Sequence, residues 1–254
     1  FPAAELSFAN ADSVLNCVVG LVEISSENSS NYNNDAITYT WMTVDGSIDA
    51  GPENDENISV TVPGTYVLEI ENSNNTCVST DSIIVLLDDV IPMAEAGIDL
   101  NIDCNNNSAT LDGSSSDAGT NIAYEWTGPN GENIPTVGST AISAGTVTAP
   151  GTYTILVSNT INGCSSIDTL VLTADTDLPI IDVETIISLD CDNPTSIIDA
   201  SGSSFGPDFE VTWLQGGTEL TETDLTLDVS TADVYTIEIL NTSNNCESSE
   251  DIFV

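Results

Sequence analysis

The cysteines of this chain recur at a fixed period. Cys17, Cys104 and Cys191 lie 87 residues apart each time, and each is followed by a tryptophan, a tyrosine and a second cysteine. The later landmarks are Trp41, Trp126 and Trp213, then Tyr66, Tyr153 and Tyr235, then Cys77, Cys164 and Cys246. A period held at so many positions is an internal repeat. We predict three domains of one kind, at residues 1–89, 90–176 and 177–254.

Hydrophobic residues inside each repeat alternate with polar ones. Segments 65–70 and 152–157 show this period of two, as do 83–87 and 169–173, and the pattern is typical of half-buried strands. Clusters of Gly, Asn, Asp and Ser separate the strands, and no segment has helical periodicity. With an early tryptophan and a late tyrosine beside a turn, each repeat is expected to be an immunoglobulin-like β-sandwich with the tryptophan in its core. The predicted fold is all-β, with three such domains in a linear array.

Two cysteines per repeat, in a chain without histidine, favour a disulfide over a metal site. One bond within each domain is expected, and in the chain-entropy model a loop of this length stabilises a domain by up to about 4 kcal/mol. The expected pairs are Cys17–Cys77, Cys104–Cys164 and Cys191–Cys246. The second cysteine follows the tyrosine by 11 residues, unlike in antibodies, so we expect it to open the last strand. A bond between neighbouring repeats, Cys77–Cys104, is the alternative.

The charge of the chain excludes several functions. It contains no Lys, Arg or His and 41 Asp and Glu, for a net charge of −41. Nucleic acids and anionic membranes are excluded as partners because both are bound through cations. The missing histidine excludes a Ser-His-Asp triad, a Cys-His dyad and a histidine zinc site. No acidic pair stands out as a glycosidase site either, so we expect no catalytic residue and no enzyme.

Acids recur where one repeat joins the next, just before Pro92 and Pro179. They are Asp88, Asp89, Asp175 and Asp177. Calcium takes six to eight oxygen ligands, so these acids are candidate ligands for an ion shared by two domains, and calcium is the one cofactor considered. The alternative is that they are solvated turn residues. Acids also cluster at residues 45–56, but their spacing does not match an EF-hand.

The motifs of the chain resemble a known repeat type. They are Asp-x-x-x-Pro at 88–92 and 175–179, Ala-Gly-Ile-Asp at 96–99, Leu-Asp-Gly-Ser-Ser at 111–115, Tyr-Glu-Trp-Thr-Gly-Pro-Asn-Gly at 124–131, Ala-Pro-Gly-Thr-Tyr at 149–153 and Asn-Gly-Cys at 162–164. Together they resemble the polycystic-kidney-disease-like (PKD-like) and immunoglobulin-like repeats of giant Bacteroidetes surface proteins, including SprB-like gliding-motility adhesins. The resemblance covers essentially the whole chain, and repeat 2 fits best. It implies export to the cell surface or the extracellular space by type IX secretion.

Three hydroxyl residues follow an aspartate and precede an aliphatic residue, as in the sites to which Bacteroidetes attach O-glycans. They are Ser13, Ser82 and Thr169. The alternative is that the acid merely begins a strand. Ser82 and Thr169 occupy equivalent positions of their repeats, which a strand that begins at the same acid in each repeat would also explain.

The first functional hypothesis is a structural or adhesive stalk or filament segment of a large bacterial surface protein. The alternatives are a carbohydrate-binding or spacer region of a secreted polysaccharide-degrading enzyme, and a subunit of a self-assembling extracellular filament. The expected partners are neighbouring repeats of the same chain, surface polysaccharide, or like chains in a filament.

The uncompensated charge predicts how stability depends on solution conditions. Like charges repel in the folded state, which raises folded carboxylate pKa values above the unfolded ones, so the native state binds more protons. The melting temperature should therefore rise with added salt, and at low salt it should rise as pH falls from 7 toward 5. A melting temperature that fell over this pH window would show that specific bonds or ions hold the carboxylates.

Overall fold

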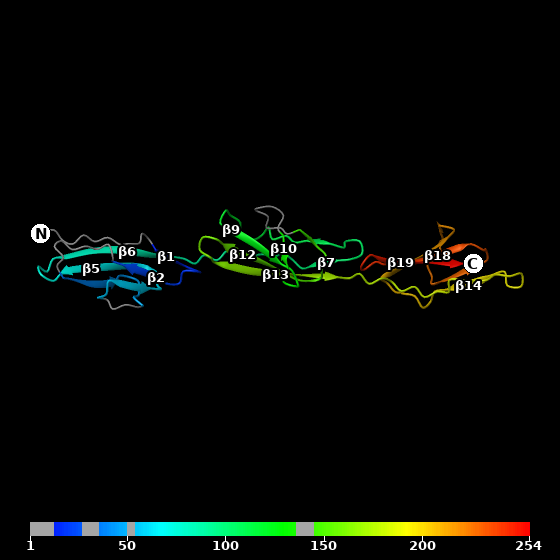
Figure 1. Ribbon diagram of the computed structural model, residues 1–254. Coiled ribbons are helices and arrows are strands. Elements are labelled where there is room, and N and C mark those ends of the chain that lie inside the picture. Colours follow the sequence, from blue (N-terminus) through cyan, green and yellow to red (C-terminus); the bar gives the residue numbers. More distant parts are fainter. Residues whose placement is uncertain (1–12, 27–35, 50–53, 136–144) are drawn as a thin grey trace. The chain divides into compact units, whose positions relative to one another are not determined.

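The computed structural model describes residues 13–26, 36–49, 54–135 and 145–254, and every regular element in these ranges is a β-strand (Figure 1). No helix in the described ranges could span a membrane. The chain divides into two compact units. Unit 1 is Phe1–Glu95, Ser114–Glu125 and Ile155–Asp168, and unit 2 is Ala96–Gly113, Trp126–Thr154 and Thr169–Val254. The domain boundaries at residues 89 and 176 stay a prediction.

Repeat 1 forms two sheets within unit 1. Its strands are β1 (Ser13–Asn16), β2 (Val22–Ser25), β3 (Ile37–Thr43), β4 (Asn57–Val60), β5 (Gly64–Asn72) and β6 (Val78–Asp88). The larger sheet has the order β1-β6-β5-β3, and β2 pairs with β4 in the smaller one. Along β5 every second side chain is buried, as the alternating pattern of residues 65–70 predicts. The result is a β-sandwich.

The other repeats also form one larger and one smaller sheet. Repeat 2 contains β7 (Leu100–Ile102), β8 (Ala109–Thr110), β9 (Ile122–Thr127), β10 (Asn133–Ile134), β11 (Thr146–Val147), β12 (Gly151–Asn159) and β13 (Ser165–Ala174). Repeat 3 contains β14 (Ser196–Asp199), β15 (Phe209–Gln215), β16 (Thr218–Glu219), β17 (Thr226–Val229), β18 (Val234–Asn241) and β19 (Cys246–Phe253). Their larger sheets have the orders β10-β9-β12-β13-β7 and β16-β15-β18-β19, and the smaller ones are β11-β8 and β14-β17.

The repeated aromatic residues form the cores. The three predicted core tryptophans are buried. Tyr66 and Tyr153 are buried too, and each hydroxyl donates to the carbonyl four residues upstream, at 2.6 and 2.7 Å. This bond is the tyrosine corner of immunoglobulin-like sandwiches, and burial raises the pKa of both phenols, so they remain donors. The prediction of tandem immunoglobulin-like β-sandwich domains is confirmed.

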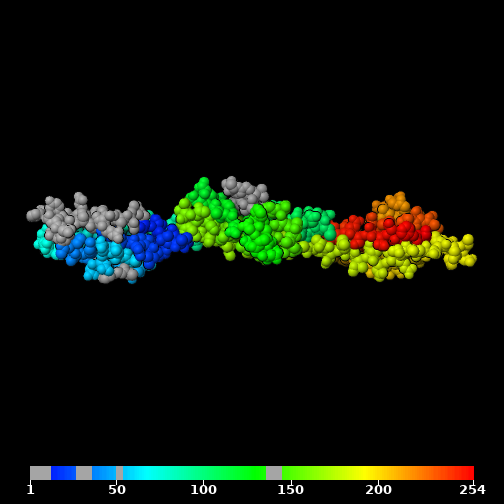
Figure 2. Space-filling model, in the orientation of Figure 1, coloured from blue at the N-terminus to red at the C-terminus, as the bar shows by residue number. Residues whose placement is uncertain are grey.

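In repeats 1 and 2 the first strand runs parallel to the last. Asn16 pairs with Asp88 and Ile102 with Ala174, so the first strand ends level with the end of the last one. In repeat 3 a parallel bridge joins Ile186 to Phe253, and Figure 2 shows the final strand, in red, lying against the yellow segment before β14. The first cysteine of a repeat therefore lies where the last strand ends.

Candidate functional site: the disulfide-linked junctions

The disulfides join successive repeats. Cys17 is bonded to Cys164, and Cys104 is bonded to Cys246. Cys77 and Cys191 are free. The predicted pairs within each repeat, Cys17–Cys77, Cys104–Cys164 and Cys191–Cys246, are therefore wrong, and so is the alternative bond Cys77–Cys104.

Strand geometry explains why the two cysteines of one repeat do not bond to each other. The second cysteine lies at the start of the last strand, as predicted, because β6 begins one residue after Cys77 and β19 begins at Cys246. The first cysteine lies at the opposite end, since β1 ends level with Asp88. An 11-residue strand such as β6 spans roughly 36 Å at about 3.3 Å per residue. Disulfides need Cα atoms less than about 7 Å apart, so the two cysteines of one repeat cannot meet.

The first cysteine of each repeat lies in a turn closed by the side chain before it. Asn16 Oδ1 accepts hydrogen bonds from the backbone N–H groups of Val18 and Val19, at 3.0 and 2.7 Å. The carboxylates of Asp103 and Asp190 accept the same two bonds in their repeats. Such side-chain bonds to the following backbone are the reason that Asn and Asp favour turns. We call this segment the first-cysteine turn (residues 16–19, 103–106 and 190–193).

The second cysteine follows a hairpin turn with its own repeated asparagine. We call this segment the second-cysteine turn (residues 72–77, 159–164 and 241–246). The residue before the cysteine has a positive φ in all three copies, which are Thr76 at 55°, Gly163 at 71° and Asn245 at 54°. The asparagine two residues before the cysteine accepts the cysteine N–H at 2.9 to 3.0 Å. These asparagines are Asn75, Asn162 and Asn244.

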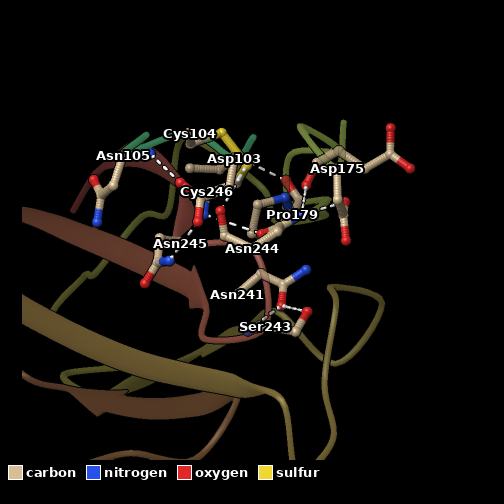
Figure 3. Close-up of a disulfide and its surroundings, with 12 residues drawn as sticks. Asp103, Cys104, Asn105, Asp175, Pro179, Asn241, Ser243, Asn244, Asn245 and Cys246 are labelled. Carbon is tan, nitrogen blue, oxygen red and sulfur yellow. Dashed lines mark hydrogen bonds between the residues drawn. A yellow bond between two sulfur atoms is a disulfide. The ribbon is translucent and has the colours of Figure 1, made fainter. Parts of the chain in front are cut away.

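Asn162 and Asn244 also bind the segment that connects the repeats. Asn162 Nδ2 donates to Asp88 Oδ1 at 2.8 Å and to the carbonyl of Val90 at 3.0 Å. Asn244 Nδ2 makes the equivalent bonds to Asp175 Oδ1 and to the carbonyl of Asp177. The close-up of this region shows Asn244 beside Asp175 (Figure 3). Both asparagines are only 1% exposed. Every polar atom of these buried amides has a partner, as burial requires.

Further bonds join the second-cysteine turns of repeats 2 and 3 to their surroundings. Ser166 and Ser248, two residues after the cysteine, donate to the carbonyls of Pro92 and Pro179. In unit 2 the N–H of Cys104 donates to the carbonyl of Asn244 at 3.2 Å. Asn245 Nδ2 also donates to Asp103 Oδ2 at 3.0 Å. The disulfide is thus one part of a hydrogen-bonded junction.

Repeat 2 uses glycine at one position because the junction is tight there. A Cβ atom on Gly163 would overlap Cγ2 of Val18, which belongs to the first-cysteine turn of repeat 1. Its positive φ also disfavours residues with side chains. Thr76 and Asn245 adopt a similar φ in the other two copies, so the close approach to Val18 is what distinguishes this position.

The candidate calcium ligands at the junctions take part in hydrogen bonds. Asp88 and Asp175 each accept a bond from a buried asparagine amide, and the backbone carbonyl of Asp177 accepts another. No group of three or more Asp, Glu, His or Cys side chains within the described ranges could hold a metal ion. Calcium binding by Asp88, Asp89, Asp175 and Asp177 stays a prediction.

The acids of the loop at residues 45–49 accept hydrogen bonds from a segment farther along the chain. Asp45 accepts a hydrogen bond from the N–H of Thr65, and Asp49 accepts from both the N–H and the hydroxyl of Thr61. These two carboxylates therefore hold the chain that leads into β5.

The candidate glycosylation residues lie on strands. Ser82 and Thr169 are exposed on β6 and β13, and Ser13 is half-buried at the start of β1. Asp12, which precedes Ser13, lies outside the described residues. Modification of these three hydroxyls stays a prediction.

Sequence reasoning missed the junction asparagines, although the sequence carries a signal for them. Asn-x-x-Asn-x-Cys occurs at 72–77, 159–164 and 241–246, and its second asparagine is the residue that binds the connecting segment. The first-cysteine turn has a signal too, because an Asn or Asp precedes each of the three cysteines. Neither pattern identifies a partner in the neighbouring repeat.

Comparisons with known proteins gave structural neighbours alone. No protein-family model matches the chain, and no curated protein sequence matches it. The I-band fragment I67–I69 from titin is 13% identical, with a TM-score of 0.48, and covers 98% of this chain and 96% of its own. The three N-terminal domains of the bacteriophage RB49 outer capsid protein Hoc are 11% identical over 99% of this chain and 98% of their own, with a TM-score of 0.38. Drosophila OTK extracellular domains 3–5 are 14% identical over 99% and 98%, with a TM-score of 0.30.

The two disulfides indicate an oxidising compartment outside the cytoplasm, because glutathione and thioredoxin keep cytosolic thiols reduced. A location at the cell surface itself stays a prediction.

The junction asparagines should matter more than their counterpart in repeat 1. Asn162→Ala removes two donated bonds at a buried position, so it should lower the free energy of unfolding by about 2 kcal/mol. Asn75→Ala is the matched control, because Asn75 holds the same place in an exposed turn and should cost less than about 1 kcal/mol. Urea unfolding of the oxidised proteins measures both. Equal losses would show that the asparagine serves its own turn and not the junction.

The two junctions should also differ in acid. The backbone N–H of Asn106, followed by the side chain of Asn245 and further N–H groups, lowers the pKa of Asp103 below its usual value of 3.8. A lowered folded pKa contributes stability that is present above the unfolded pKa and lost as pH falls through the folded one. Below about pH 4, the turn at Cys104 should therefore loosen, whereas Asn16 at Cys17 does not titrate.

A phosphine reductant that works in acid can measure this difference within one molecule. The rate of reduction of Cys104–Cys246, divided by that of Cys17–Cys164, should rise as pH falls from 5 to 3. Asp103→Asn should make the ratio independent of pH, since the amide oxygen still accepts the turn bonds. A ratio that rises equally in this variant would assign the effect to other carboxylates.

Proposed function

We propose that the chain is a load-bearing segment of an extracellular structural or adhesive stalk. The observation that carries this proposal is that each disulfide crosses from one repeat to the next. Successive domains are therefore connected twice, by the peptide and by a sulfur–sulfur bond. The motif resemblance to Bacteroidetes surface adhesins agrees with this role and suggests a bacterial cell surface as its location.

The disulfides overlap along the sequence. The loop from Cys17 to Cys164 and the loop from Cys104 to Cys246 share residues 104–164. A pulling force that enters at the N-terminus passes through the first disulfide to Cys164. Its shortest covalent path then runs back along the chain to Cys104 and through the second disulfide to Cys246. Most of the polypeptide lies outside this path, so unfolding of the domains would release only part of the length of the chain.

The size of this effect follows from the reach of an extended chain. All 254 residues would span about 900 Å at roughly 3.6 Å per residue. With both bonds intact, the path contains residues 1–17, 104–164 and 246–254, which span about 300 Å. A stalk of this design limits its extension under load even after its domains unfold.

A carbohydrate-binding role has less support. Sugars stack on exposed aromatic faces, as ligands with apolar surfaces do. The exposed aromatic side chains in the described ranges are Phe205 and Phe253, while the tryptophans are buried. The aromatic content of the sandwiches serves their cores.

Single-molecule stretching between terminal handles tests the proposal. The oxidised chain should reach its limit at about 300 Å and the reduced chain at about 900 Å. The double variant Cys17→Ser/Cys164→Ser keeps one bond, and its limit should be about 400 Å. A load-bearing role is contradicted if the oxidised chain lengthens as far as the reduced one, or if its disulfides break at forces that leave the domains folded.

A further inference from the structure

Two halves of the junction stand unjoined in the described part of the chain. That part contains three first-cysteine turns and three second-cysteine turns, and two of each are joined in the two disulfides. The remaining first-cysteine turn carries Cys191, and the remaining second-cysteine turn carries Cys77. Both cysteines are solvent-accessible, with Cys191 exposed and Cys77 half-buried.

The turn at Cys191 already has the bonded conformation. Asp190 Oδ1 accepts from the N–H groups of Asp192 and Asn193, at 2.8 and 2.7 Å. Asp103 makes the same two bonds beside Cys104, at 2.9 and 2.6 Å. A further backbone bond, from Asp190 N to the Asn193 carbonyl, matches that from Asp103 to Asn106. The turn around Cys191 therefore has the same hydrogen bonds as the turn around Cys104, which is bonded to Cys246.

The turn at Cys77 is likewise preformed, and one side of it is uncovered. Asn75 Oδ1 accepts the Cys77 N–H at 2.9 Å, as Asn162 and Asn244 accept at their cysteines. Asn162 and Asn244 are 1% exposed because a neighbouring repeat and its connecting segment cover them, whereas Asn75 is exposed. The surface that the other two turns bury in a junction is open at Cys77.

We propose that Cys191 and Cys77 are complementary linkage sites, each of which forms a disulfide with the matching turn of another repeat of this kind. A second copy of the chain offers both matching turns, so Cys191 of one copy bonds to Cys77 of the next. The contact is head-to-tail. A linked pair therefore keeps one free Cys77 and one free Cys191, so further copies add to it and form a filament. This inference goes beyond the load-bearing role and does not depend on it.

The bond requires an oxidant, which a small disulfide such as oxidised glutathione supplies. The thiolate of one cysteine attacks the small disulfide and releases one glutathione, and the second thiolate then displaces the other glutathione. Two protons leave the thiols and two electrons reduce the small disulfide. The product is one protein disulfide and two reduced glutathiones.

Charge repulsion and the lack of a connecting peptide determine the solution conditions in which two copies can link. Each copy has a net charge of −41, so copies repel unless salt screens them, and at 0.15 M the Debye length is about 8 Å. Separate copies also lack the connecting peptide that Asn162 and Asn244 bind within the chain. The linked product should therefore form in salt with oxidised glutathione and separate on reduction.

Two single variants test the pairing. Cys77→Ser retains Cys191 alone, and Cys191→Ser retains Cys77 alone. Mixed in equal amounts with oxidised glutathione, they should give almost entirely the mixed dimer, whereas random collision would give it for only half of the linked product. Each variant alone should stay monomeric. Digestion at acidic residues, since trypsin has no site here, followed by mass spectrometry identifies the Cys191–Cys77 peptide.

Other outcomes overturn the proposal. Homodimers of either variant in random proportion would show that the cysteines are merely accessible, and an unlinked mixture would show that the turns do not meet. The Cys17–Cys164 and Cys104–Cys246 peptides from the same digests report that each variant is folded. Since stretching depends on those two bonds and linkage on Cys77 and Cys191, each proposal can fail without the other.

Discussion

The parallel pairing of the first strand with the last is the constraint on which the rest of this structure depends. It brings the end of the first strand level with the end of the last, so the first-cysteine turn lies where the chain leaves the domain. The second cysteine lies a full strand length away, at the start of the last strand. Each domain therefore has one cysteine at either end, and both disulfides of the described residues cross to another repeat.

The sequence predicted the fold well because its landmarks are local. Alternation along 65–70 and 152–157, a tryptophan in a central strand and a tyrosine bonded to the carbonyl four residues upstream all concern one domain and its core. The disulfide pairs could not be predicted in the same way. Spacing gives two cysteines per repeat, but only the parallel register shows that they lie at opposite ends. The junction asparagines were missed for the same reason, since their partners Asp88 and Asp175 lie in the segment between repeats.

The composition explains the chemistry of the junctions. A chain without Lys, Arg or His cannot form side-chain ion pairs, so its carboxylates need neutral donors. Asparagine amides and backbone N–H groups supply them at Asp88, Asp103 and Asp175. Acids that the sequence suggested as ligands for a cation act in the structure as hydrogen-bond acceptors for a buried amide. That use requires no ion from the medium.

The overlap of the two disulfide loops has a consequence for degradation. A peptide bond cut anywhere between Cys17 and Cys246 lies inside at least one loop, and a cut between Cys104 and Cys164 lies inside both. The two pieces therefore stay covalently attached after any single cleavage in this range. At least two cuts are required to release a fragment. Together with the lack of any site for trypsin-like proteases, this connectivity protects the continuity of the chain in surroundings that contain secreted proteases.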